Sequence, residues 1–185
     1  MTTADFLFFL WIEFVKAAFI MFPAYATNTF PPLARGKRPL DFGKFLGKGR
    51  ILGDGKTIEG TFLGLLIGFY VGITEAIAYP NLNAIAVSLG GELPRMTIFL
   101  GFLIPIAAMT GDIVGSFIKR RLGIPRGGKD RFIDRLGFVI FTIAFAYWFT
   151  EITFTMIFFM LVFTPILHRS ANIYGNKIKL KKVPW

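Results

Sequence analysis

Residues 96–121 read MTIFLGFLIPIAAMTGDIVGSFIKRR, and this stretch decides the fold class. No charged residue precedes Asp112 in it, and three basic residues close it. A helix needs about 20 mostly apolar residues to cross a hydrocarbon core about 30 Å thick. A crossing that begins at Met96 ends at Gly115 and leaves Asp112 about one turn below the membrane surface. We therefore expect a membrane-spanning helix that carries a carboxylate near one end.

The rest of the chain has the same apolar character. Of 185 residues, 54% are hydrophobic and 17% are charged, whereas about a quarter are charged in soluble domains. A chain of this size cannot bury so much apolar surface in one small core. Composition excludes disordered, collagen-like and disulfide-rich classes, and the absence of Cys removes thiolate chemistry. The single His, His168, argues against histidine-based catalysis or metal binding.

Apolar stretches suggest five membrane spans. The first has no basic segment before it and no cleavage site after it, so we read it as a retained span and not a signal peptide. Residues 136–167 are too long for one crossing and carry Glu151 near the middle, where a charge in lipid is costly. We therefore predict a tight helical hairpin around Thr150–Glu151. The expected spans are 6–27, 61–79, 93–117, 131–150 and 152–168.

Most basic residues lie in three segments. Basic residues outnumber acidic residues 21 to 11, which gives a net charge of +10. Of these 21 residues, 19 lie between spans one and two, around the connection between spans three and four, or in the tail. Basic loops stay cytoplasmic, so five spans place the N-terminus outside and the C-terminus inside. We predict one all-α integral membrane domain, residues 1–185, in the cell membrane. Loops 28–60 and 118–130 would build its cytoplasmic face and active site.

Excess positive charge on so apolar a protein favours a polyanionic partner at the membrane, either lipid phosphates or nucleotides, over nucleic acid. On the third span, Asp112, Ser116, Lys119 and Arg120 share one helical face. If the fourth span extends back to residue 131, Asp134 lies at a similar depth. Two such acids among basic residues resemble a divalent cation site, and Mg²⁺ favours one or two carboxylates plus substrate phosphates. The alternative is that the acids simply pair with neighbouring basic residues, Asp112 with Lys119 and Asp134 with Arg135.

A second candidate site is the stretch 53–60, GDGKTIEG. It is not a nucleotide-triphosphatase phosphate loop, because Arg50 stands where that pattern needs Gly and no strand precedes it. Its glycines still let backbone N–H groups approach an anion, Lys56 adds charge and Thr57 is placed to cap the following helix. A plain turn before a capped helix is an equal alternative. Asn28, at the end of the first span, either contacts a nucleotide or marks a helix stop before two prolines.

The acidic motifs resemble those of a known family. The run Gly111-Asp112, Ser116, Lys119-Arg120, Gly123 and Asp134-Arg135 is similar to the signature of CTP-dependent phosphatidate cytidylyltransferases. The small size, the five spans and the Gly-Asp-Gly-Lys-Thr loop look closer to the archaeal branch, the CDP-archaeol synthases. This sequence differs from the bacterial family pattern at two places near the expected metal ligands. Residues 126–129 read RGGK where the bacterial pattern has His-Gly-Gly, and Leu136-Gly137 replaces a further acid.

The resemblance implies the reaction. It transfers CMP from CTP to the isoprenoid ether-lipid phosphate 2,3-bis-O-geranylgeranyl-sn-glycerol 1-phosphate and releases pyrophosphate. It also implies Mg²⁺ on Asp112 and Asp134, with Lys119 and Arg135 as further catalytic residues. The nucleotide and phosphate would be bound by Asn28, Gly53, Asp54, Gly55, Lys56, Thr57, Ser116, Arg120 and Lys129.

Two other functions remain open at this point. A CTP-dependent polyprenol kinase would share these membrane features but would release CDP and no pyrophosphate. A small transporter would need polar residues at mid-membrane, whereas the spans are almost purely apolar apart from Glu13, Lys16 and Glu75. A CDP-alcohol phosphotransferase is disfavoured because residues 54–59 break its Asp-Gly-x-x-Ala-Arg pattern. The sequence does not fix the oligomeric state.

Overall fold

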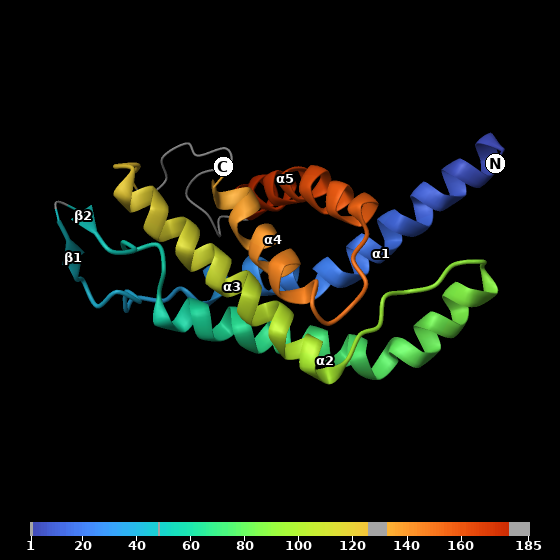
Figure 1. Cartoon of the computed structure of the whole chain (residues 1–185). Coiled ribbons are helices and arrows are strands. Elements are labelled where there is room, and N and C mark those ends of the chain that lie inside the picture. Colours follow the sequence, from blue (N-terminus) through green and yellow to red (C-terminus); the bar gives the residue numbers. More distant parts are fainter. Residues whose placement is uncertain (1, 48, 126–132, 178–185) are drawn as a thin grey trace.

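The computed structural model is mainly helical (Figure 1). It describes residues 2–47, 49–125 and 133–177, without the side chains of residues 133–135, 168, 171–172 and 174–175. The elements are α1 (Thr3–Thr29), the 3-10 helix η1 (Pro31–Ala34), β1 (Phe45–Leu46), β2 (Gly49–Arg50), α2 (Ile58–Ser88), α3 (Ile98–Arg121), α4 (Ile133–Ala146) and α5 (Phe154–Lys177).

Three of these helices are long and apolar enough to cross a membrane, namely α1, α2 and α3. The apolar parts of the other two are shorter, residues Leu136–Ala146 of α4 and Phe154–Leu167 of α5. The prediction of a helical membrane protein is therefore confirmed at this coarse level. All five expected spans correspond to helices, while five full crossings remain a prediction.

Two helices extend beyond the expected spans. The helix that contains the expected span 61–79 continues through Pro80 to Ser88. A proline removes only one backbone donor, which a membrane helix tolerates. The return chain is tied back to this extension, because the Leu93 amide donates to Asn83 Oδ1 at 2.8 Å. The last helix likewise continues past the expected residue 168 to Lys177.

The break between the fourth and fifth helices is confirmed, but the connection is not a tight turn. Seven residues, 147–153, separate α4 from α5. Thr153 ends this connection as a helix cap, since its hydroxyl accepts the Met156 amide at 3.1 Å. The same hydroxyl donates to the buried carboxylate of Glu13, which also accepts from Lys16 Nζ at 2.9 Å. Two of the polar residues inside the first span are thus used to hold α5 against α1.

A stripe of glycines lets α2 pack closely on its neighbours. Gly60, Gly64, Gly68 and Gly72 are all buried and recur every fourth residue. A Cβ at Gly72 would lie 2.4 Å from the Gly101 carbonyl oxygen of α3, and one at Gly68 only 2.0 Å from Thr27 Oγ1 of α1. Small residues at such positions allow helix backbones in a membrane to approach each other.

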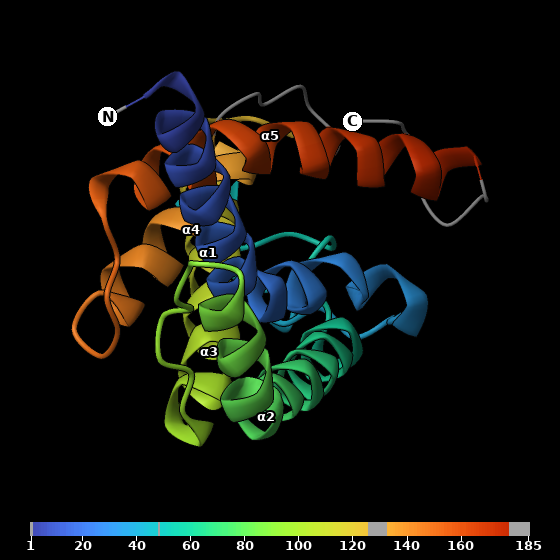
Figure 2. The same ribbon diagram turned by 90° about the vertical axis from the view of Figure 1, so that its right-hand side faces the viewer.

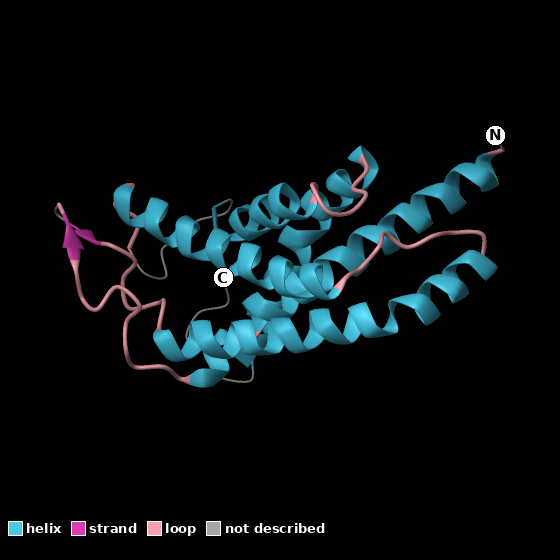
Figure 3. Ribbon diagram, turned by 60° about the horizontal axis from the view of Figure 1, so that its bottom comes forward, coloured by secondary structure: helices cyan, strands magenta, loops and turns pink. Residues whose placement is uncertain are grey.

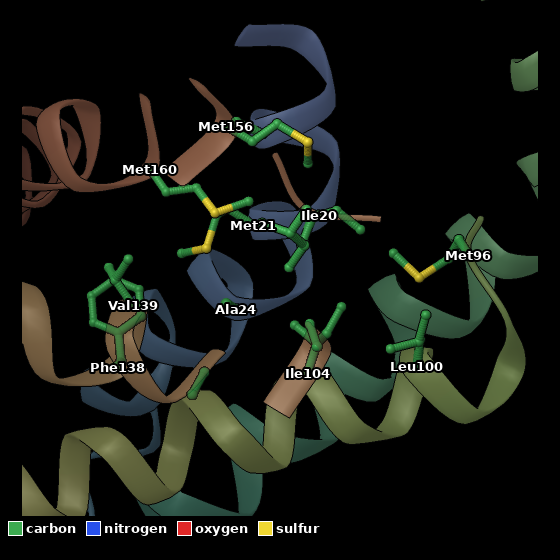
Figure 4. Packing of buried hydrophobic residues seen from close by; sticks show 14 residues of the cluster. Ile20, Met21, Ala24, Met96, Leu100, Ile104, Phe138, Val139, Met156 and Met160 are labelled. Carbon is green, nitrogen blue, oxygen red and sulfur yellow. The ribbon is translucent and has the colours of Figure 1, made fainter. Parts of the chain in front are cut away.

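Helix α1 is the centre of the bundle, because it contacts each of the other four helices. In Figure 2, α5 runs across α1 and not alongside it. Figure 4 shows the core where the helices meet. Its buried side chains come from four helices and the segment before α3: Ile20, Met21, Ala24, Met96, Leu100, Ile104, Phe138, Val139, Met156 and Met160.

One end of the bundle is built from loops. Residues 30–57 and the C-terminal end of α3 lie together there, and we call this end the loop face (Figure 3). It includes an antiparallel hairpin in which Phe45 pairs with Arg50 and Leu46 with Gly49. The sequence indicated irregular backbone here, and the hairpin was not anticipated. The N-terminus and the C-terminal end of α2 lie at the opposite end (Figure 1).

Candidate functional site

The two predicted motifs meet through Lys56 and Asp112. Lys56 lies in the loop just before α2, Asp112 lies in the C-terminal half of α3, and Lys56 Nζ donates to Asp112 Oδ2. The two side chains are 23% and 19% exposed, so the pair is largely but not completely shielded from solvent. Asp112, which the sequence predicts as a metal ligand and alternatively as a partner of Lys119, thus contacts the lysine of the other motif. The loop face brings together residues 56 positions apart.

Helix α4 passes close to Asp112. A Cβ at Gly111 would lie 2.6 Å from the Gly137 carbonyl oxygen, so the backbones of α3 and α4 nearly touch beside this acid. Asp134 lies on α4 one turn before Gly137. The side chains of Asp134 and Arg135, and all of Lys129, lie outside the described part of the chain. Their predicted roles therefore remain predictions, although the helix that carries Asp134 is in the required place.

Further polar groups lie near Asp112 on α3. Ser116 and Lys119, which the sequence places on the same helical face as Asp112, are both buried. The Nε of Arg120 is buried and has no hydrogen-bond partner within the described part of the chain. A Cβ at Gly53 would lie 3.7 Å from Arg120 Nη1, so this guanidinium lies beside the predicted phosphate-binding loop. A buried donor without a partner is costly and is available to an anionic ligand.

The predicted phosphate-binding loop contains a left-handed glycine and a helix cap. Gly53 has φ +80°, a left-handed conformation that favours glycine. Thr57 caps α2, because its Oγ1 accepts the Gly60 amide at 3.2 Å. Asp54 is 63% exposed and accepts from Arg50 Nη1 at 2.9 Å, so its expected contact with substrate stays a prediction. Substrate contacts of Gly55 and Thr57 likewise stay predictions.

Asn28 occupies the last turn of α1, next to the start of α2. Its Nδ2 donates to the Ala24 carbonyl at 3.3 Å, which accounts for one half of the amide. The other half, Oδ1, is buried and has no hydrogen-bond partner among the described residues. Such an acceptor suits a ligand donor, for example an exocyclic amine on a nucleotide base. Among the described residues, two of the predicted site positions thus carry a buried polar atom without a hydrogen-bond partner. They are the acceptor Asn28 Oδ1 and the donor Arg120 Nε.

Sequence reasoning missed a buried carboxylate in the first loop. Asp41 accepts from Arg50 and from three backbone amides, and these contacts hold the pKa of its carboxyl well below its usual range. Arg50 was noticed only as the residue that breaks the phosphate-loop pattern. No periodic signal links the two, because they pair within an irregular loop. The one indication in the sequence was that both residues lie in the loop that ends with Gly-Asp-Gly-Lys.

The donor set fits a magnesium ion held jointly with substrate phosphates. In the described ranges, no group of three or more His, Asp or Glu side chains could hold a metal alone. Asp112 contributes one carboxylate, and Mg²⁺ commonly takes only one or two together with phosphate oxygens. Lys56 and Arg120 supply positive charge from two directions. The arrangement is therefore suited to a metal-loaded triphosphate and not to an all-protein metal cage.

The chain is similar to proteins of one known family. A family model described as "CarS-like: CDP-archaeol synthase" matches residues 9–185. The chain is 41% identical to the CDP-archaeol synthase of Pyrococcus horikoshii over 94% of this chain and 98% of that protein. It is 40% identical to that of Thermococcus kodakarensis over 95% and 99%. For Methanococcoides burtonii the identity is 41%, over 89% and 100%.

A solved structure also resembles this fold. It is described as "Structural insight into an intramembrane enzyme for archaeal membrane lipids biosynthesis". The two chains are 34% identical, with a TM-score of 0.71 over 86% of this chain and 94% of the other.

Proposed function

The chain belongs to the CDP-archaeol synthase family, and on that premise we propose how its loop face performs CMP transfer. The substrates are CTP and 2,3-bis-O-geranylgeranyl-sn-glycerol 1-phosphate, and the products are CDP-archaeol in its unsaturated form and pyrophosphate. The observation that carries the proposal is the contact between Lys56 and Asp112, which joins the two motifs at one point.

The reaction needs no nucleophile from the protein. An oxygen of the lipid phosphate attacks the α-phosphorus of CTP, a new P–O bond forms, and the bond to the pyrophosphate oxygen breaks. Since the nucleophile is already an anion, catalysis consists of positioning the substrates and offsetting negative charge. Lys56, Lys119 and Arg120 are the described cations of the site, and we assign them to the phosphates. We also assign Arg135 and Lys129 to the phosphates.

Mg²⁺ would be held by Asp112 together with Asp134. When bound, it would supply charge neutralisation across the triphosphate, so that pyrophosphate leaves more easily. Lys56 donates to Asp112, which holds this carboxylate in place at the loop face. The buried Oδ1 of Asn28 is assigned to a donor on the nucleotide.

The site lies where both substrates can reach it. CTP is soluble in water and the lipid phosphate resides in the bilayer, so the reaction has to occur at the interface. We propose five crossings, with the N-terminus outside and the loop face in the cytoplasm, because the basic residues concentrate at that face. The two polar residues inside the first span support an enzyme over a transporter, since Glu13 and Lys16 bind each other and α5.

Product analysis tests the proposal. The purified protein, given CTP, Mg²⁺ and the ether-lipid phosphate, should form a CDP-lipid and one pyrophosphate per turnover. Without the lipid phosphate, no pyrophosphate should appear. Release of CDP, with phosphorylation of a polyprenol acceptor, would instead identify a kinase and refute the proposal.

A further inference from the structure

We propose that Asp41, paired with Arg50, is a positioning residue that shapes residues 52–56 and so places Lys56 against Asp112. The inference rests on the proposed function, because it assigns a role in binding CTP at the same site. Neither residue is assigned to touch the substrate. Their effect passes through the backbone of the loop.

The carboxylate of Asp41 holds several parts of the first loop together. Its side chain is almost fully buried, with 1% exposed. Arg50 binds it with two nitrogens, Nη2 to Oδ1 at 2.6 Å and Nε to Oδ2 at 3.3 Å. The carboxylate also accepts the amides of Gly43 at 3.1 Å, Leu52 at 2.9 Å and Gly53 at 3.0 Å. A buried carboxylate with this many donors is fully satisfied and conformationally fixed.

These contacts fix the backbone of Lys56 from both sides. The Leu40 amide, next to Asp41 in the chain, donates to the Lys56 carbonyl at 2.8 Å. The Lys56 amide donates to the carbonyl of Gly53 at 3.4 Å, and Gly53 is itself held by Asp41. One of these two hydrogen bonds thus leads to Gly53, which the Asp41 carboxylate holds, and the other leads to the residue next to Asp41 in the chain. Loss of that carboxylate would free the lysine from its place at Asp112.

The loop that Asp41 and Arg50 hold together also contacts α3, the helix that carries Asp112. Arg121, at the end of α3, donates to the carbonyl oxygens of Leu46, Gly49 and Arg50 in the hairpin. The guanidinium of Arg50 is bound by Asp41 and Asp54, so its charge is already matched within the loop. These contacts distinguish Arg50 from Lys56, which pairs with Asp112 of the other motif, and from Arg120, whose buried Nε has no partner among the described residues. Arg50 serves the loop, and the other two face the substrate.

The test uses Asp41→Asn and Arg50→Lys in the full-length protein. Asparagine keeps the shape but loses the charge and turns one acceptor into a donor, while lysine keeps the charge but loses the two-pronged contact. Lys44→Gln is the matched control, because Lys44 is exposed on the same loop. Each variant is measured by hydrogen exchange over residues 51–57 and by steady-state kinetics with CTP and lipid varied separately.

In Asp41→Asn we expect exchange over residues 51–57 to accelerate about tenfold, because one oxygen that accepted backbone amides becomes an N–H donor. The KM for CTP should rise about tenfold while the KM for the lipid changes less than about twofold. Arg50→Lys should be the milder variant, and Lys44→Gln should match the wild type. If the loop loosens while the KM for CTP stays constant, the positioning role is wrong and the proposed function stands. If the wild type makes no CDP-lipid, the proposed function fails, whatever the exchange shows.

Discussion

Lys56 connects the two predicted motifs through its contact with Asp112. Substitution of Lys56 should therefore lower activity. Lys56→Met leaves Asp112 without its described partner and removes a charge that we assign to the triphosphate. We expect CTP turnover to fall about 100-fold, as for loss of one preorganised charge at a transferred phosphoryl group. Lys56→Arg should recover part of that loss. Steady-state kinetics with Lys44→Gln as the control measures the effect, and near-normal turnover of Lys56→Met would contradict the assignment.

Asp41 predicts how the loop responds to acid. Its contacts lower the pKa of its carboxyl from the reference value of 3.8. A depressed pKa in the folded state contributes stability at pH values above the unfolded pKa, and that stability is lost as the pH falls below it. Hydrogen exchange over residues 51–57, corrected for intrinsic rates, should therefore be protected equally at pH 7 and pH 5 and should accelerate below about pH 4.

The variant Asp41→Asn provides the control for this pH dependence. Its loop should already exchange rapidly at pH 7 and should gain little further from acid, because the titrating group is gone. Loss of protection in the wild type between pH 7 and pH 5 would point to another group and would contradict the assignment to Asp41.

Among single residues, those on helices were predictable and those in the loop were not. Spacings of four, seven and eight residues placed Ser116, Lys119 and Arg120 beside Asp112 because a helix repeats its faces regularly. The contact between Lys56 and Asp112 could be expected only from the chemistry of the two motifs. The pair Asp41 and Arg50 could not be foreseen, since no periodic rule relates residues across an irregular loop.

The glycine stripe of α2 determines how closely it packs on α3. Gly72→Val would place side-chain atoms into the backbone of Gly101, and the two helices would have to separate. We expect a loss of about 1–3 kcal/mol in the free energy of unfolding, which is typical of overpacking. Thermal unfolding in detergent measures it. Leu66→Phe, which adds volume at an exposed position of the same helix, is the control and should unfold as the wild type does.

Helix positions followed from apolar patterning, whereas helix ends did not always. Thr97 caps α3 and Thr57 caps α2, so both starts follow from local chemistry. The continuation of α2 beyond Pro80 depends on a later segment, which folds back through Leu93 onto Asn83. The wide connection before α5 likewise depends on Glu13, in a different helix. Contacts between distant segments cannot be read from a local pattern.

The distribution of charge over the whole molecule predicts its orientation. The chain contains no Cys, so single cysteines can be introduced at Lys44 on the loop face and at Ser88 at the far end of α2. A helix of 31 residues separates the two ends by about 46 Å, which is enough to cross a membrane. In intact cells, a membrane-impermeant maleimide should label Ser88→Cys and should label Lys44→Cys only after permeabilisation. Labelling of Lys44→Cys from outside would reverse the proposed orientation.

The central claim is that Asp112 and Asp134 hold the metal of a metal–CTP complex at the loop face. Binding of Mn²⁺ as a spectroscopic substitute for Mg²⁺, followed by electron paramagnetic resonance in the presence of CTP, tests it directly. The wild type should bind Mn²⁺ together with CTP, and both Asp112→Asn and Asp134→Asn should lose that binding while they unfold at the wild-type temperature. Retention of wild-type Mn²⁺ affinity by either variant would contradict the account.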